Sequence, residues 1–121
     1  MRDIQLVLER WGGWASSDCS GVDYSSIAAG FKGLLIQTGK SRLMCTDDDA
    51  LIIESCLYQL KKKRPNEHSL LVAHYLYGIS KRAIARKCGK DEKLIRIEMQ
   101  VAEGFIGGCL AMLDVKLDMD C

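Results

Sequence analysis

The sequence predicts an all-α protein, a single domain of residues 1–121 with five or six helices and no sheet. Three observations support this fold class. Apolar residues recur at intervals of three and four along most of the chain, as they do on the buried side of a helix. Residues that favour helix starts, such as Pro65, Ser80 and Asp91, stand where these apolar patterns begin. The composition, 48% hydrophobic and 27% charged, is that of an ordinary globular protein.

The first part of the chain contains two of the predicted helices. Residues 3–14 form the first helix, because five apolar residues share one side of it: Ile4, Val7, Leu8, Trp11 and Trp14. Gly12 and Gly13 weaken the end of this helix, and residues 16–21 are predicted to form a loop. A short helix over residues 24–35 follows, with these residues on one side: Ile27, Ala28, Phe31 and Leu35.

The middle of the chain contains two more helices. After an irregular stretch over residues 37–45, three aspartates at residues 47–49 suit a helix N-terminus, because the helix dipole favours negative charge there. They lead into a helix over residues 51–62. We interpret the aspartates as a capping cluster rather than a metal site, because no partner ligands stand nearby in the sequence. The only proline, Pro65, can open the next helix, and Gly78 can end it.

A helix-turn-helix motif is predicted over residues 78–106. Ser80 can cap its first helix, Gly89 supplies a tight turn, and Asp91 can cap its second helix. The inward side of the first helix consists of Ile84, Ala85 and Cys88. The second helix has six residues for the core: Leu94, Ile95, Met99, Ala102, Phe105 and Ile106. We expect it to pack closely on the N-terminal helix and so to continue past Gly104, Gly107 and Gly108.

The charge of the chain is concentrated in one segment. Residues 61–96 hold eleven Lys and Arg against three Asp and Glu, a net charge of +8. Residues 1–60 carry a net charge of −3 and residues 97–121 carry −4, so the whole chain is only +1. A basic segment between acidic flanks is typical of a surface that faces phosphates. The alternative is an ordinary solvated face.

The basic segment contains the helix-turn-helix motif, whose second helix fits the major groove of DNA. Lys and Arg can reach guanine there, and Gln can pair with adenine. The candidate DNA-binding residues are Lys81, Arg82, Arg86, Lys90, Lys93, Arg96 and Gln100. A helical hairpin with no role in DNA binding is the alternative interpretation. The run from Lys61 to Arg64 either attracts phosphate or is simply solvated.

No catalytic, cofactor or metal site is predicted. Residues 33–41 end in Gly-Lys-Ser like a Walker A loop, but Leu34 stands where that loop needs glycine and no strand precedes it. The six cysteines include no Cys-x-x-Cys pair, so we expect reduced thiols without zinc. His68 and His74 are too far apart along a helix to chelate one ion. Neither a signal peptide nor an apolar run of about 18–20 residues is present, and no membrane contact is expected.

Two resemblances to known families follow from these residues. Six positions of the motif resemble the helix-turn-helix of sigma factor region four: Ser80, Ile84, Ala85, Gly89, Ile95 and Arg96. Three longer stretches resemble the antitermination protein Q family of lambdoid phages: MRDIQLVLERWGGWASSDCSGVDYSSIAAGFKGLL, HYLYGIS and AEGFIGGCLAMLDVKLDMD. This second resemblance covers essentially the whole chain. It is to the smaller, all-helical branch, which lacks the clustered cysteines of the zinc-binding branch.

The resemblance to the Q family implies a phage late-gene transcription antiterminator rather than an enzyme. Such a protein binds double-stranded DNA at a Q binding element near the late promoter and engages paused host RNA polymerase with its sigma factor. It then makes the polymerase read through terminators by narrowing the RNA exit channel. Nascent RNA and a second copy of the chain on DNA are further candidate partners, and the implied location is the cytoplasm of the bacterial host.

The alternative function is a static helix-turn-helix repressor or activator that never leaves its site. The same seven DNA-binding residues would serve it. The acidic end of the chain, residues 117–120, is either a partner surface or a frayed tail. The sequence does not identify the DNA site, the stoichiometry on DNA or the residues that contact polymerase or RNA.

Overall fold

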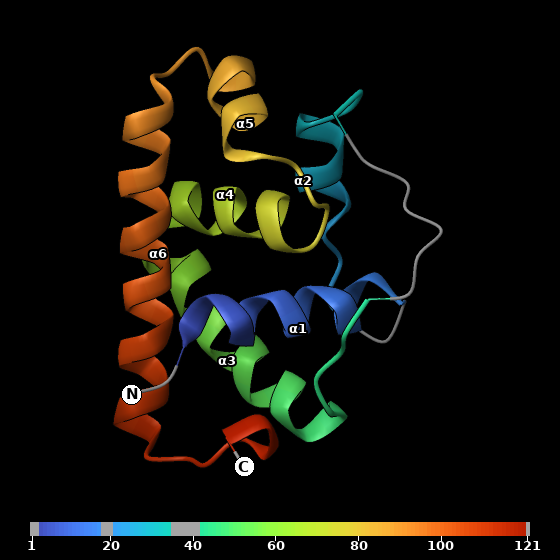
Figure 1. The fold of residues 1–121 in the computed structure, drawn as a ribbon, viewed down its shortest axis with the longest axis vertical. Helices are drawn as coiled ribbons and strands as arrows, with labels where there is room; N and C mark the ends of the chain where they lie inside the picture. Colours follow the sequence, from blue (N-terminus) through green and yellow to red (C-terminus); the bar gives the residue numbers. More distant parts are fainter. Residues whose placement is uncertain (1–2, 18–20, 35–41, 121) are drawn as a thin grey trace.

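The computed structural model describes residues 3–17, 21–34 and 42–120. It contains six α-helices and one short 3-10 helix, and no strand occurs within these ranges. In chain order (Figure 1) the helices are α1 (Ile4–Ser16), α2 (Ser25–Gly30), α3 (Asp47–Lys63), α4 (Pro65–Tyr75), α5 (Lys81–Cys88), α6 (Glu92–Leu113) and the 3-10 helix η1 (Asp118–Asp120). The prediction of an all-α fold with five or six helices is therefore confirmed.

The central element of the fold is α4, which packs against all five other α-helices. Residues 70–73 of α4 are four consecutive apolar residues, and all of them are buried, because a helix covered on every side needs apolar residues all round. The longest helix, α6, runs the length of the molecule along one side, and α5 lies beside its first turns (Figure 1). The largest fully buried side chains are Leu8, Trp11, Ile53, Leu57, Leu60, Leu71, Ile79, Ile84, Ile95, Met99, Ile106 and Leu110.

α1 runs through its two glycines and continues to Ser16, two residues beyond the predicted end at Trp14. Both are buried where another backbone passes close by. A Cβ at Gly12 would overlap the carbonyl oxygen of Tyr75, and one at Gly13 would overlap that of Leu43. The Arg42 guanidinium strengthens the first approach by donating to the carbonyl oxygens of Tyr75 (2.6 Å) and Leu76 (3.0 Å). The glycines therefore let the end of α4 and the segment before α3 lie directly against α1.

The C-terminal segment is fixed to the start of α3, so the frayed-tail alternative for residues 117–120 is wrong. Leu117 is fully buried. The buried carboxylate of Asp49 accepts the backbone N–H groups of Asp118 (2.8 Å) and Met119 (3.2 Å). The Thr46 hydroxyl also donates to the carboxylate of Asp118 (2.8 Å). One aspartate of the predicted capping cluster thus satisfies the N-terminal amides of η1.

Several helix boundaries differ from those predicted. α3 begins at Asp47 rather than Leu51, because the Thr46 hydroxyl accepts the N–H of Asp49 (3.2 Å) and caps the helix there. α2 ends at Gly30 rather than residue 35, because Gly33 has a φ of 92° and a right-handed helix cannot include it. Part of the predicted loop over residues 16–21 and part of the irregular stretch over residues 37–45 lie outside the described residues.

The glycines of α6 confirm the expected close packing at one position. A Cβ at Gly107 would lie 3.2 Å from the side chain of Ile4 in α1. A Cβ at Gly104 or Gly108 would have no neighbour within 4 Å. Packing on the N-terminal helix therefore accounts for Gly107, and the other two glycines lie on the exposed side of α6.

We expect Gly12→Ala to lower the free energy of unfolding by about 1–3 kcal/mol, because the new methyl group must displace the backbone of α4. Gly104→Ala is the matched control, since it makes the same change in an exposed part of a helix. It should raise the free energy of unfolding by as much as about 1 kcal/mol, because alanine favours the helix. Urea denaturation measures both. Equal effects in the two variants would contradict the close approach at Gly12.

The stability of the fold should also depend on pH through His68. This residue is buried in α4 and stacked on the Tyr24 ring at a centroid distance of 6.3 Å. Burial, with a smaller contribution from the positive charge of Lys61, lowers the pKa of His68 from 6.5 to about 4. The unfolded chain therefore takes up a proton at a higher pH than the folded chain does. The stability that the neutral imidazole provides is present above pH 6.5 and is lost as the pH falls towards 4.

The full loss corresponds to about 3 kcal/mol, obtained by converting the shift in pKa to free energy. Urea denaturation of the parent protein and of His68→Leu, at a series of pH values between 7 and 5, isolates this contribution because carboxylates titrate mostly below that range. The parent should lose stability more steeply than the variant. Parallel pH profiles would show that the imidazole is not buried in its neutral form.

Candidate nucleic-acid interface

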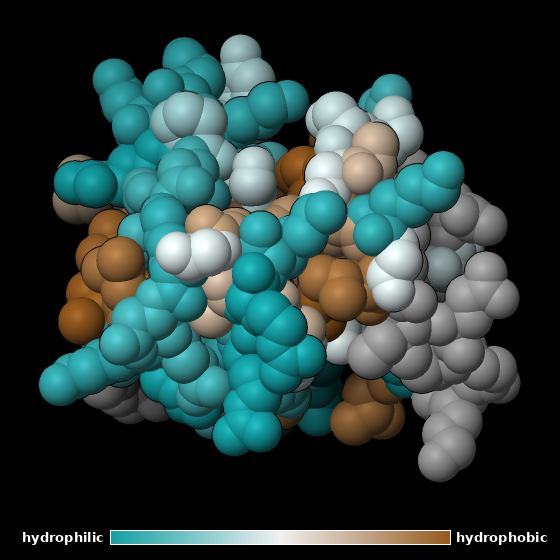
Figure 2. All heavy atoms as spheres, turned by 90° about the horizontal axis from the view of Figure 1, so that it is seen from above, coloured by the Kyte–Doolittle hydropathy of each residue, from teal (hydrophilic) through white to brown (hydrophobic). Residues whose placement is uncertain are grey.

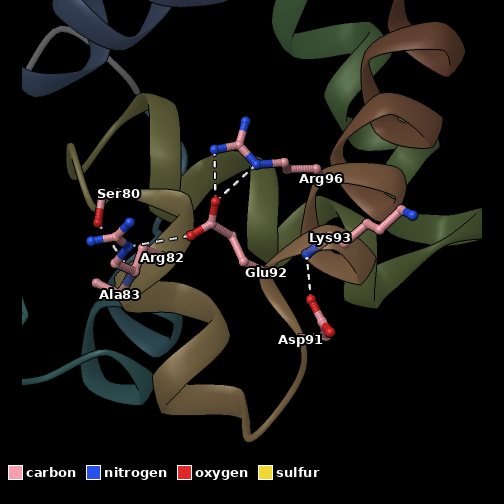
Figure 3. Close-up of polar contacts among 7 residues, drawn as sticks. All are labelled: Ser80, Arg82, Ala83, Asp91, Glu92, Lys93 and Arg96. Atoms are coloured by element: carbon pink, nitrogen blue, oxygen red, sulfur yellow. Dashed lines mark hydrogen bonds and ion pairs between the residues drawn. The ribbon is translucent and has the colours of Figure 1, made fainter.

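The helix-turn-helix over residues 78–106 has the local structure that its sequence predicts (Figure 3). The Ser80 hydroxyl accepts the N–H of Ala83 (3.1 Å) and caps α5. Gly89 ends α5 in the left-handed conformation, with a φ of 66°. The Asp91 carboxylate accepts the N–H of Lys93 (2.9 Å) and caps α6. The turn therefore begins at Gly89 and ends at Asp91, two residue types that favour the end and the start of a helix, respectively.

An apolar contact holds the two helices together. Ile84 and Ala85 of α5 are buried, and so are Ile95 and Met99 on the side of α6 that faces the core. Cys88 does not belong to this contact, contrary to the prediction, and its side chain is exposed. It is the last residue of α5, where the chain already turns away at Gly89.

The structure places six of the seven candidate DNA-binding side chains in solvent, and Lys81 is half-buried. α5 carries Lys81, Arg82 and Arg86, the turn carries Lys90, and α6 carries Lys93, Arg96 and Gln100. Seen from the end of the molecule where α5 lies, the surface is mostly hydrophilic (Figure 2). The exposed side of the motif therefore combines cations from both helices with the polar side chains that α6 would insert into a groove.

Two of these cations converge on Glu92 in the first turn of α6 (Figure 3). Arg96 donates to one carboxylate oxygen of Glu92 through two nitrogens, at 2.7 and 3.0 Å, and Arg82 donates to the other at 3.4 Å. The hydrogen bond from Arg96 and then that from Arg82 hold the pKa of Glu92 below its usual range, so the carboxylate is ionised. The Arg82 and Arg96 side chains remain 78% and 57% exposed, so DNA could exchange these weak surface contacts for its own.

No role was predicted for Glu92 from the sequence. The sequence does contain a signal for the ion pair of Glu92 with Arg96, because the two residues are four apart and lie on the same side of a helix. The contact with Arg82 joins α5 to α6 across the turn, and spacing in the sequence could not indicate it.

Glu98 forms a second link, on a different side of α6. It accepts from the Lys90 ammonium at 3.1 Å and from the Asn66 side chain at 3.3 Å. Asn66 stands near the start of α4, two residues after the exposed basic run from Lys61 to Arg64. Glu98 thus places the junction of α3 and α4 next to the turn of the motif. The basic run from Lys61 to Arg64 therefore lies near the exposed cations of the motif.

Other classes of site find no support in the described parts of the chain. No group of three His, Cys, Asp or Glu side chains there is arranged to hold a metal ion. None of the helices there combines the length and the apolar character that crossing a membrane requires. Burial raises the pKa of the Cys45 thiol to about 11, with a further contribution from the charge of Asp49, so this cysteine is a poor nucleophile at neutral pH.

The fold is similar to that of two solved structures. One is the selenomethionine derivative of transcription antitermination factor Q21, with a TM-score of 0.70 and 20% identity, covering 90% of this chain and 85% of that one. The other is Q21 in complex with Q21-binding-element DNA, with a TM-score of 0.67 and 22% identity, covering 90% of this chain and 87% of that one.

Other relatives have a much higher sequence identity to this chain. A probable antitermination protein Q of Acyrthosiphon pisum secondary endosymbiont phage 1 is 56% identical over 120 residues, which are 98% of this chain and 81% of the relative. The prophage antitermination protein Q homolog QuuD of Escherichia coli strain K12 is 49% identical over 120 residues, 99% of this chain and 94% of the relative. The model of the phage antitermination protein Q family matches residues 1–118, and this chain belongs to that family.

Proposed function

We propose that this chain is a transcription antiterminator that binds DNA through residues 78–106 of a single domain and then acts on RNA polymerase. Membership of the antitermination protein Q family is the observation that carries this proposal. A structural neighbour with the same fold is described in complex with its DNA element. The exposed cations on α5, the turn and α6 supply the positive surface that duplex DNA requires.

The candidate residues divide into two groups by their place in the motif. Lys93, Arg96 and Gln100 lie at spacings of three and four on α6, so they can face the base edges of the major groove together. The cations of α5 and the turn flank that helix and can contact the phosphates on either side: Lys81, Arg82, Arg86 and Lys90. Residues of the first group would specify the sequence, and residues of the second group would position the protein.

After it binds DNA, the protein is proposed to transfer to RNA polymerase. The protein would load at an element near a phage late promoter onto paused host RNA polymerase with its sigma factor, in the cytoplasm of the bacterial host. It would then travel with the enzyme and narrow the RNA exit channel, so that terminator hairpins do not form. Nascent RNA and a second copy of the chain on DNA are further partners of this proposal, which requires neither catalysis nor a cofactor.

We expect Arg96→Ala and Arg82→Ala to weaken DNA binding in different ways. The loss of a base contact at Arg96 should cost about 1–3 kcal/mol on the preferred site and relax the sequence preference. The loss of a phosphate contact at Arg82 should weaken binding to all sequences alike and lower the salt slope by about one unit. Fluorescence anisotropy with a duplex selected from a random library, at several salt concentrations, measures both effects.

Lys116→Ala is the matched control for these variants, because it removes one exposed positive charge beyond the far end of α6. It should leave site binding and the salt slope nearly unchanged. If Arg96→Ala binds the selected duplex as tightly as the parent protein does, α6 is not the recognition helix.

A transcription assay tests the proposal against a static regulator. Protein added to a template with its element and a distal intrinsic terminator should raise read-through at that terminator. Deletion of the element should abolish the effect, because loading from DNA supplies the local concentration that a weak contact with polymerase needs. Excess competitor DNA added after loading should leave read-through intact, since the polymerase then holds the protein. Unchanged termination after loading would favour the repressor or activator.

A further inference from the structure

An apolar ridge lies on the exposed side of α6, within the part of the helix proposed to enter the major groove. Leu94, Ile97 and Val101 are 43%, 49% and 41% exposed, although each is a large hydrophobic residue. The prediction that Leu94 belongs to the core is therefore wrong. The spacings of three and four between these three residues place them on one side of the helix, away from the buried residues Ile95 and Met99. In Figure 2, hydrophobic side chains are visible at the edge of the molecule along which α6 runs, with hydrophilic side chains next to them.

The position of Ile97 on this ridge is set by its polar neighbours. It follows Lys93 by four residues and precedes Gln100 by three, so it lies between these two side chains on the helix surface. Arg96 is its immediate neighbour in the chain. Any docking that brings Lys93 and Gln100 to base edges must therefore also bring the Ile97 side chain into the groove.

The major groove offers one apolar group to such a side chain, the C5-methyl group of thymine. The cations that flank the ridge favour a polyanion as its partner, since an apolar protein surface would supply no counter-charge to Lys93. We propose that Ile97 contacts a thymine methyl group and so determines the base at one position of the DNA site, with Leu94 and Val101 extending the apolar contact. This inference rests on the proposed DNA binding by α6 and adds a source of specificity that charge alone does not provide.

Replacing thymine by deoxyuridine tests this directly, because the change removes only the methyl group and preserves base pairing. The probe is the tightest duplex that the full-length protein selects from a library of random double-stranded sequences. Each thymine is replaced in turn, and binding is measured by anisotropy. At one thymine position we expect the parent protein to lose about threefold to fivefold in affinity, the amount expected for one buried methyl group.

Ile97→Ala should lose a similar factor on the unmodified duplex and should no longer distinguish thymine from deoxyuridine at that position. Met112→Ala is the control, because Met112 is a more exposed apolar residue (86%) near the far end of the same helix. It should keep the full sensitivity to the methyl group. Ile97 is exposed, so its truncation should leave the fold intact, which circular dichroism can verify.

The outcomes separate this inference from the proposed function. If the protein selects no duplex, DNA binding itself fails. If it binds a preferred site but every deoxyuridine substitution is neutral, or if Ile97→Ala keeps the parent's sensitivity, the methyl contact is overturned while DNA binding stands. If Ile97→Ala binds DNA like the parent but loses read-through, the ridge contacts a protein of the transcription complex and the inference is wrong.

Discussion

The structure depends on the burial of residues 70–73 of α4. This helix contacts every other α-helix, so its place fixes the relative positions of all of them. Its C-terminal carbonyl groups accept from Arg42, and Gly12 gives its last turn room against α1. The chain then leads directly to the motif through Ile79, which is buried and whose N–H donates to the carbonyl oxygen of Ala73 (3.1 Å). The candidate DNA-binding motif is therefore anchored by the centre of the core rather than attached by a free linker.

α6 serves the core and the candidate interface at once. One side of it supplies buried residues along most of its length, from Ile95 to Leu110, and the other side carries the polar residues and the apolar ridge. A buried hydrogen bond from the Tyr75 hydroxyl to Glu103 (2.8 Å) joins it to α4, and burial raises the pKa of Tyr75, so that the hydroxyl stays protonated and donates. α6 consequently cannot reorient without disturbing the core, and in the proposed complex this favours binding with little change of shape.

Sequence reasoning located the turn of the motif and both of its caps because the determining interactions there are local. Ser80, Gly89 and Asp91 act within three residues of their own positions, so their identities suffice to locate the turn and both caps. It failed where distant segments meet. The role of Gly12 depends on the backbone of Tyr75, and that of Asp49 depends on amides about 70 residues later, neither of which leaves a local signal. At the candidate site, spacing indicated which α6 side chains share a face, but not that Arg82 would reach Glu92 from α5.

The distribution of charge explains how a chain with a net charge of only +1 can still approach DNA in one orientation. The cations of α5 and the turn lie at one end of the molecule, whereas the start of α3 and the C-terminal segment lie at the opposite end (Figure 1). That opposite end carries Asp47, Asp48, Asp49 and Asp118. A polyanion therefore attracts one end and repels the other, so encounters in the wrong orientation are disfavoured, while the low net charge limits binding to DNA in general. In the proposed complex, this modest electrostatic attraction leaves a larger share of the affinity to short-range contacts along α6, and those are the contacts that can distinguish one base sequence from another.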